Sequence, residues 1–125
     1  MALYCYQGMF NNCTSLPIAP NLPATTLADY CYASMFYGCT LLIIPPELPA
    51  TILKPYCYYR MFYNCSSLTI PIQLPALTLV DSCYYEMFRN CSKIKLSATQ
   101  TGDYQTPYRI PIEGTGSNIV SNSLT

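Results

Sequence analysis

The fold of this chain is decided by residues 29–39, which read DYCYASMFYGC. Close copies of this stretch stand at 3–13, 55–65 and 81–91, so the pattern returns every 26 residues. Ladders of identical cysteine, methionine and phenylalanine residues keep that step through all four copies. A period of this size is typical of a solenoid, in which each unit buries its apolar side only by stacking on its neighbours.

The composition argues against several classes of function. Six Lys and Arg balance six Asp and Glu, and charged residues make up 10% of the 125 residues, against about 25% in typical soluble domains. Without a basic patch we expect no nucleic-acid partner. Histidine is absent, which removes the commonest general base and metal-binding imidazole. No apolar run approaches the roughly 18 residues that cross a bilayer, so we predict no transmembrane segment.

The beginning of the chain indicates that it is part of a longer repeat array. Residues 1–5 lack the basic region and the apolar stretch of a signal peptide. Met1 aligns with Leu27 of the next copy, so the sequence opens inside a repeat.

The first half of each repeat has a spacing that predicts an α-helix. Leu53, Cys57 and Met61 follow one another at intervals of four, which describes one face of a helix. Thr26 and Asp29 form a T-x-x-D sequence that suits a helix N-terminus. Gly or Asn recurs where a left-handed residue would end the helix. These residues are Asn12, Gly38, Asn64 and Asn90.

The second half of each repeat alternates in a way that predicts a short strand. Stacked repeats would then form a parallel sheet with two ladders pointing inward. The first ladder is Leu16, Leu42, Leu68 and Ile94, and the second is Ile18, Ile44, Ile70 and Leu96. We therefore expect four repeats over 1–96, followed by a degenerate fifth repeat or C-terminal cap with a flexible tail over 97–125.

The repeats resemble a known class, the BspA-like leucine-rich repeats of bacterial surface proteins. Residues 61–71, MFYNCSSLTIP, are similar to the A-F-x-x-C-S-S-L-T-x-I portion of that motif, and the match covers residues 2 to about 96. The resemblance implies an α/β leucine-rich-repeat solenoid with a parallel strand face and a helical convex face. It also implies an extracellular or bacterial cell-surface adhesion module that binds a protein or host extracellular-matrix ligand, with no catalytic residues and no cofactor.

The eight cysteines could form disulfides, hold a metal or pack as small apolar groups. Neighbouring helices about 8–10 Å apart are too distant for disulfides, and in-register strand neighbours point the same way. A C-x7-C spacing without histidine fits neither zinc nor an activated nucleophile. We therefore predict stacked, reduced, buried thiols and no enzymatic activity. The two ladders are Cys5, Cys31, Cys57 and Cys83, and Cys13, Cys39, Cys65 and Cys91.

The outward side of the predicted strands is the candidate binding surface, because solenoids commonly bind on such a face. Leu41 and Ile43 would form a small apolar spot on it, although contact with a flanking domain would explain that spot equally well. The candidate surface comprises Ser15, Leu41, Ile43, Ser67, Thr69, Lys93 and Lys95. The alternative functions are a structural spacer or stalk without its own ligand and, more remotely, an intracellular scaffold.

Overall fold

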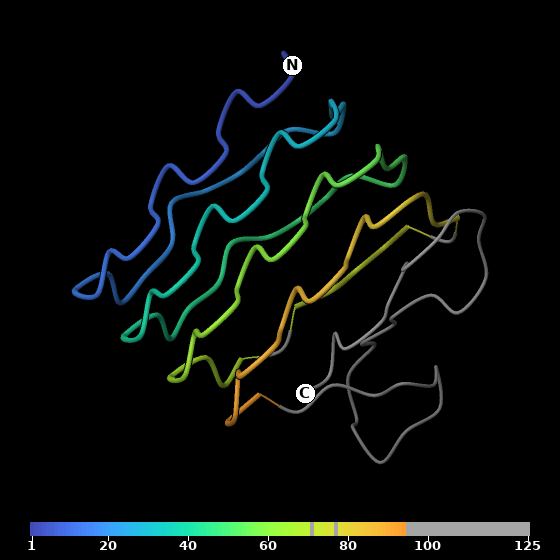
Figure 1. Ribbon diagram of the computed structural model, residues 1–125. Coiled ribbons are helices and arrows are strands. Elements are labelled where there is room, and N and C mark those ends of the chain that lie inside the picture. Colours follow the sequence, from blue (N-terminus) through green and yellow to red (C-terminus); the bar gives the residue numbers. More distant parts are fainter. Residues whose placement is uncertain (71, 77, 95–125) are drawn as a thin grey trace.

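The protein is a stack of coils, one coil for each sequence repeat, as the computed structural model in Figure 1 shows. The structure describes residues 1–70, 72–76 and 78–94.

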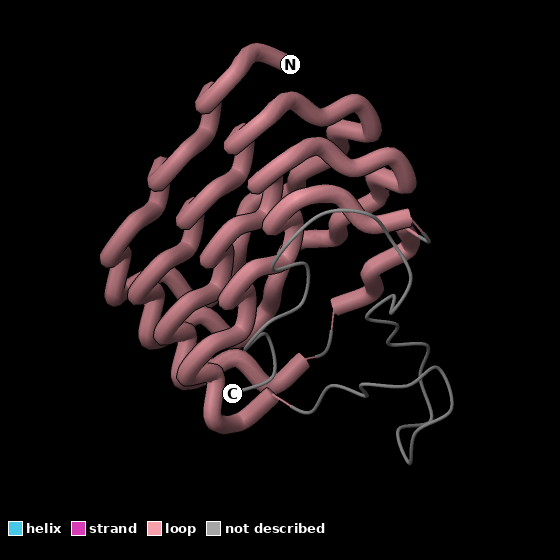
Figure 2. Tube along the Cα trace, turned by 45° about the vertical axis from the view of Figure 1, so that its right-hand side comes forward, coloured by secondary structure: helices cyan, strands magenta, loops and turns pink. Residues whose placement is uncertain are grey.

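We name the coils by their place in the sequence. They are coil 1 (1–26), coil 2 (27–52), coil 3 (53–78) and coil 4 (79–94). Successive coils lie side by side from the N-terminal end of the stack onward (Figures 1 and 2). The expected cap over 97–125 lies outside the described residues.

The predicted helices and the predicted strand face are wrong. No described residue is helical, and the β pairing of the described ranges is limited to isolated bridges such as the parallel one between Ile18 and Ile44. Turns and loops make up the coloured tube of Figure 2. The chain is therefore not a leucine-rich-repeat solenoid with a strand face and a helical face.

The first half of each coil is a ribbon of consecutive β-turns. The N–H of Ala33 donates to the carbonyl of Tyr30, and that of Met35 donates to Tyr32. Ser34, the third residue of the second turn, has a φ of 53°. A positive φ at that position is the mark of a type II turn, whereas the turn before it has no positive φ at its centre and is of type I. The two types therefore alternate along the ribbon.

The remaining N–H groups of the ribbon join neighbouring coils. Tyr32, for example, donates to the carbonyl of Cys57 at 3.0 Å, and Phe36 donates to Met61 at 2.9 Å. Five such hydrogen bonds of 2.7 to 3.2 Å connect the ribbon of each coil to that of the next. Successive ribbon residues thus alternate: one donates its N–H within its own coil, and the next donates to the following coil. These two kinds of hydrogen bond satisfy the buried N–H groups of the ribbon.

This ribbon explains why the sequence pattern suggested a helix. A pair of turns advances the chain by four residues, so Leu27, Cys31 and Met35 all face the core. The left-handed residue that we expected at a helix end is present, although it ends the ribbon instead. Its φ lies between 58° and 72° in the four coils, at Asn12, Gly38, Asn64 and Asn90.

The core consists of identical side chains stacked from coil to coil. Phe36 lies 5.5 Å from Phe10 and 5.6 Å from Phe62 between ring centroids, and Phe88 continues the stack at 5.7 Å from Phe62. Parallel ladders of buried tyrosine, methionine and cysteine flank it. Fully burying one such side chain is worth about 1.5–3 kcal/mol, so the ladders supply the cohesion that helices and sheets provide in other folds.

Only one of the two expected aliphatic ladders faces the core. Leu42 and Leu68 are buried, as the alternation predicted, but Ile18, Ile44 and Ile70 are exposed, so the inward placement of these three is wrong. Leu96, the fourth residue of the second ladder, lies outside the described residues. The first ladder belongs to the last turn of the ribbon, because Leu42 N–H donates to the carbonyl three residues earlier. No continuous strand follows that turn in the described residues, so the two-residue alternation does not carry on.

A glycine substitution distinguishes this ribbon from a helix by the sign of its effect. We expect Ser34→Gly to stabilise the protein by roughly 0.5–1 kcal/mol, because glycine adopts a positive φ without strain. In a helix the same change would destabilise by a similar amount. Chemical denaturation measures the free energy of unfolding of the variant and the wild type. Ala33→Gly is the control: it removes a buried methyl group at a residue whose φ is not positive, so it should lower stability. A loss for Ser34→Gly would contradict the turn ribbon.

Candidate binding surface

Five exposed aliphatic side chains gather where the ribbons of coils 1 to 3 end. We call them the aliphatic patch, and they are between 42% and 56% exposed: Ile18, Leu41, Ile43, Ile44 and Ile70. The bridge between Ile18 and Ile44 places them on adjacent coils. Ile43 is fixed beside them, because its N–H donates to the carbonyl of Pro17 at 2.9 Å. The backbone that carries the patch is therefore held by hydrogen bonds between the two coils.

A groove borders the aliphatic patch on the returning half of coils 2 and 3. It has a volume of about 570 Å³, and Ile44 and Ile70 of the patch form part of its wall. Prolines make up much of the remaining wall, together with Glu47 and Gln73. Because the proline ring fixes φ, the backbone of this wall is stiff.

The sequence-derived candidate surface overlaps this patch through Leu41 and Ile43. Ser15, Thr69 and Lys93 are also exposed, Ser67 is half-buried, and Lys95 lies outside the described residues. Three isoleucines of the patch were missed, because the alternation placed them in the core.

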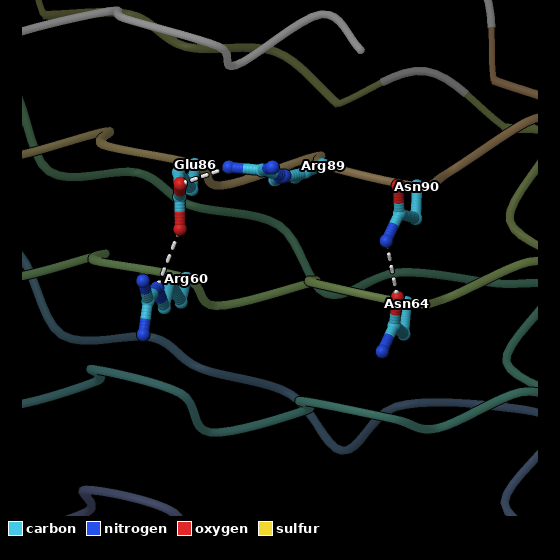
Figure 3. A network of polar contacts seen from close by, with 5 residues as sticks. All are labelled: Arg60, Asn64, Glu86, Arg89 and Asn90. Carbon is cyan, nitrogen blue, oxygen red and sulfur yellow. Dashed lines mark hydrogen bonds and ion pairs between the residues drawn. The ribbon is translucent and has the colours of Figure 1, made fainter.

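A second surface feature, also missed, links coils 3 and 4 through charge (Figure 3). The buried carboxylate of Glu86 accepts a hydrogen bond from Arg60 Nε at 2.6 Å and another from Arg89. Beside it, the amide of Asn90 donates to Asn64 Oδ1 at 2.8 Å. Both oxygens of Glu86 are thus engaged, while the two guanidinium groups remain partly exposed.

Aromatic rings support the two arginines of this cluster. The guanidinium of Arg60 lies 4.9 Å from the ring centre of Tyr59, and that of Arg89 lies 6.0 Å from Tyr63. Tyr59 in turn stacks on Tyr85 of the next coil at 5.6 Å. Because stacked tyrosines cover one another's faces, this surface presents ring edges, hydroxyl groups and guanidinium N–H groups.

The sequence did contain a signal for the charged cluster. The positions of Arg60 and Glu86 are occupied by Gly8 and Ser34 in the first two coils. Stacking alone therefore does not require charge there. A departure from the repeat that introduces opposite charges one period apart indicates contact between successive coils.

The cluster predicts an acid-dependent loss of stability. Burial by itself would raise the pKa of Glu86, but the hydrogen bonds and charges of Arg60 and Arg89 outweigh it and lower that pKa. An acid whose pKa falls on folding stabilises the protein above its unfolded value, near 4.3, and loses that contribution as the pH drops through the folded pKa.

Unfolding by urea at neutral and acid pH checks this expectation. Glu86→Gln should be less stable than the wild type at pH 7, and the difference should shrink as the pH is lowered below about 4. The exposed Glu47, changed to Gln, is the matched control and should alter stability by less than about 0.5 kcal/mol. A difference for Glu86→Gln that stays constant from neutral to acid pH would contradict the ion pairing.

The cysteines are free thiols, as the sequence predicted, and six of the eight are buried, whereas Cys5 is exposed and Cys13 half-buried. Cys39 Sγ donates to the carbonyl of Phe10 at 3.0 Å, and Cys65 Sγ donates to Phe36 at 3.1 Å. Burial raises the pKa of Cys39 to about 11. Such a thiol stays protonated near neutral pH, so Cys39 and Cys65 act as apolar core groups that each donate one hydrogen bond.

Neither a metal centre nor a membrane span is found in the described ranges. The Cys, Asp and Glu residues there do not form a group of three or more that could hold a metal ion. The same ranges contain no helix with the length and hydrophobicity needed to cross a bilayer.

Comparison with known proteins identifies no relative. No family, no curated protein and no solved structure matches the chain.

Proposed function

We propose that this chain is a non-enzymatic protein-binding segment that contacts its partner through the aliphatic patch. The observation that carries the proposal is the exposure of five aliphatic side chains on adjacent coils beside a proline-lined groove. A contiguous apolar patch on a protein surface is typical of an interaction site, whereas single exposed apolar residues are common everywhere.

The remaining chemistry supports binding over catalysis. The buried thiols are held protonated, and both oxygens of Glu86 are occupied by arginine. Neither group is therefore placed to act as a nucleophile or a general base. The similarity of the repeats to a motif of bacterial surface proteins makes an extracellular adhesion partner, such as a host matrix protein, the first class to test.

The test replaces two side chains of the patch by charge. Leu41→Asp combined with Ile43→Asp should lower binding to immobilised extracellular-matrix proteins at least tenfold, because carboxylates in an apolar contact lose their hydration without gaining a partner. Ile52→Asp places one carboxylate on an exposed isoleucine outside the patch, and it should bind like the wild type. Unchanged binding by the folded double variant would contradict the role of the patch, and a chain that binds none of these proteins would favour the spacer.

A further inference from the structure

The two arginines beside Glu86 keep hydrogen-bonding capacity that the stack itself does not use. Arg60 reaches Glu86 through Nε, and Arg89 reaches it through one terminal nitrogen. A guanidinium group has five N–H donors, and neither arginine makes a further hydrogen bond within the described part of the chain. Their side chains are 38% and 41% exposed. Most of their donors are therefore available to a ligand.

Glu86 fixes the direction of both guanidinium groups. Its carboxylate is buried, and Figure 3 shows Arg60 and Arg89 reaching it from two successive coils. The pKa of Glu86 is lowered, so the carboxylate stays charged near neutral pH. Two positive groups then face one negative group, which leaves one positive charge in excess. A ligand meets arginines that are already oriented, and this reduces the conformational entropy lost on binding.

The stack does not need these charges in order to form. Residues 1–52 contain neither lysine nor arginine. Coils 1 and 2, which are described throughout, stack with Gly8 and Ser34 at the position that Arg60 and Glu86 occupy in coils 3 and 4. The arginine pair is therefore an addition to the repeat, and its unused donors point to a contact outside the stack.

The aromatic rings beside the arginine pair are covered on their faces. Tyr63 stacks on Tyr37 at 4.8 Å between ring centroids, and the two guanidinium groups lie 5.7 and 6.0 Å from its ring centre. Tyr59 stacks on Tyr85, and the guanidinium of Arg60 lies over Tyr59. Proteins hold the bases of single-stranded nucleic acid by stacking them on free aromatic faces. This surface does not offer such faces, so it does not suit that ligand.

Neutral polar groups complete the surface around the arginines. Asn90 donates to Asn64 Oδ1, so the amide nitrogen of Asn64 keeps its two donors and Asn90 keeps its acceptor oxygen. The tyrosine hydroxyls can both donate and accept. Sugar hydroxyls also donate and accept, so they can use all of these groups, whereas the carboxylates of an acidic peptide accept only. The mixture of cations and neutral polar groups fits a polysaccharide that carries anionic groups.

We propose that Arg60 and Arg89 form a binding site for an acidic polysaccharide, a chain of sugars with sulfate or carboxylate groups. The free N–H groups of the arginines hold the anionic groups, because a guanidinium can pair with an oxyanion through two parallel hydrogen bonds. The tyrosine hydroxyls and the asparagine amides contact the sugar hydroxyls. Glu86 is a positioning residue, since it touches the arginines and not the ligand. The site shares no residue with the aliphatic patch and does not rest on the function proposed for it.

Titration calorimetry of the full chain with a heparin octasaccharide, at physiological ionic strength, tests the proposal. The wild type should bind saturably. Arg60→Lys combined with Arg89→Lys keeps both charges beside Glu86 but loses the planar fork, so it should bind about fivefold or more weakly. Lys54→Gln removes a whole charge from an exposed residue of coil 3 outside the site and should weaken binding less than about twofold. Attraction by net charge alone would give the opposite order.

Related ligands identify the anionic group and separate a polysaccharide from a peptide. A hyaluronan octasaccharide carries carboxylates and no sulfate. If it binds as heparin does, carboxylate is sufficient, and if heparin alone binds, the site takes sulfate. A glutamate peptide with as many charges as the better glycan should bind about tenfold more weakly, because it lacks the hydroxyl contacts. A peptide that binds equally tightly would overturn the choice of a polysaccharide.

A footprint on the wild type locates the site without any variant. Saturating heparin octasaccharide should protect Arg60 and Arg89 from an arylglyoxal reagent that modifies guanidinium groups, as mass spectrometry of the digested protein measures. A neutral dextran oligosaccharide should not protect them. Equal modification with and without heparin would overturn the proposal. So would the absence of binding to both acidic glycans, or a loss in Lys54→Gln as large as in the double lysine variant.

Discussion

Replacing Phe62 by alanine should lower the free energy of unfolding by about 3–5 kcal/mol. Phe62 is fully buried and stacks on Phe36 at 5.6 Å and on Phe88 at 5.7 Å. Its removal leaves a cavity between two rings that the backbone hydrogen bonds of coils 2, 3 and 4 prevent from closing. Urea denaturation followed by tyrosine fluorescence measures the loss.

Phe10→Ala is the matched control for this prediction. Phe10 has the same side chain in the same ladder, but it is only half-buried and stacks on one ring, that of Phe36. Its loss should therefore be clearly smaller than that of Phe62. Equal losses at the two positions would mean that the ladder does not act through stacking on both sides.

Ser34→Pro should destabilise the protein by roughly 3 kcal/mol or more. The Ser34 N–H donates to the carbonyl of Tyr59 at 2.7 Å, and its φ is 53°. Proline removes that donor and holds φ near −65°, which is opposite in sign to what the ribbon needs. The change therefore breaks one cross-coil hydrogen bond and reverses one turn. Thermal unfolding by circular dichroism provides the measurement.

Proline five residues earlier provides the control. Pro55 already occupies in coil 3 the position that Asp29 occupies in coil 2, and the Asp29 N–H donates no backbone hydrogen bond among the described residues. Asp29→Pro should therefore be tolerated. If both variants lose stability alike, the alternation of donors along the ribbon is not what holds the coils together.

The repeat itself could be predicted from the sequence because stacking requires it. A period of 26 residues that preserves cysteine, methionine and phenylalanine predicts that each of these side chains stacks on the identical one in the next coil. The structure has these ladders in its core. The left-handed residue at Gly38 and Asn64 could be predicted as well, since few residue types accept a positive φ. Both inferences depend on local chemistry or on periodicity alone.

The type of local structure could not be predicted in the same way. Four residues of an α-helix overshoot a full turn by about 40°, so a helical face alternates spacings of three and four. Leu27, Cys31, Met35 and Cys39 are spaced by four throughout and are all buried. That strict spacing favours a unit of two β-turns over a helix. The other left-handed positions, such as Tyr30 and Ser34, gave no signal because tyrosine and serine are ordinary residues elsewhere.

The candidate surface was predicted only in part for a related reason. Leu41 and Ile43 were placed on the outside by the strand alternation and are exposed, but that alternation also placed Ile44 inside. The last turn of the ribbon ends at Leu42. The side chains of Ile43 and Ile44, which follow it, both reach the surface. A pattern that alternates between inside and outside cannot predict two consecutive exposed side chains.

The cross-coil hydrogen bonds also give the stack an electrical polarity. The peptide unit between Cys31 and Tyr32 accepts from coil 1 with its oxygen and donates to coil 3 with its N–H, and its counterparts along each ribbon point the same way. Each peptide unit has a dipole of about 3.5 D. Aligned units add, so the stack has a macrodipole along its axis, as an α-helix has, with the negative end at coil 1. Every coil of this pattern lengthens that dipole without adding a net charge.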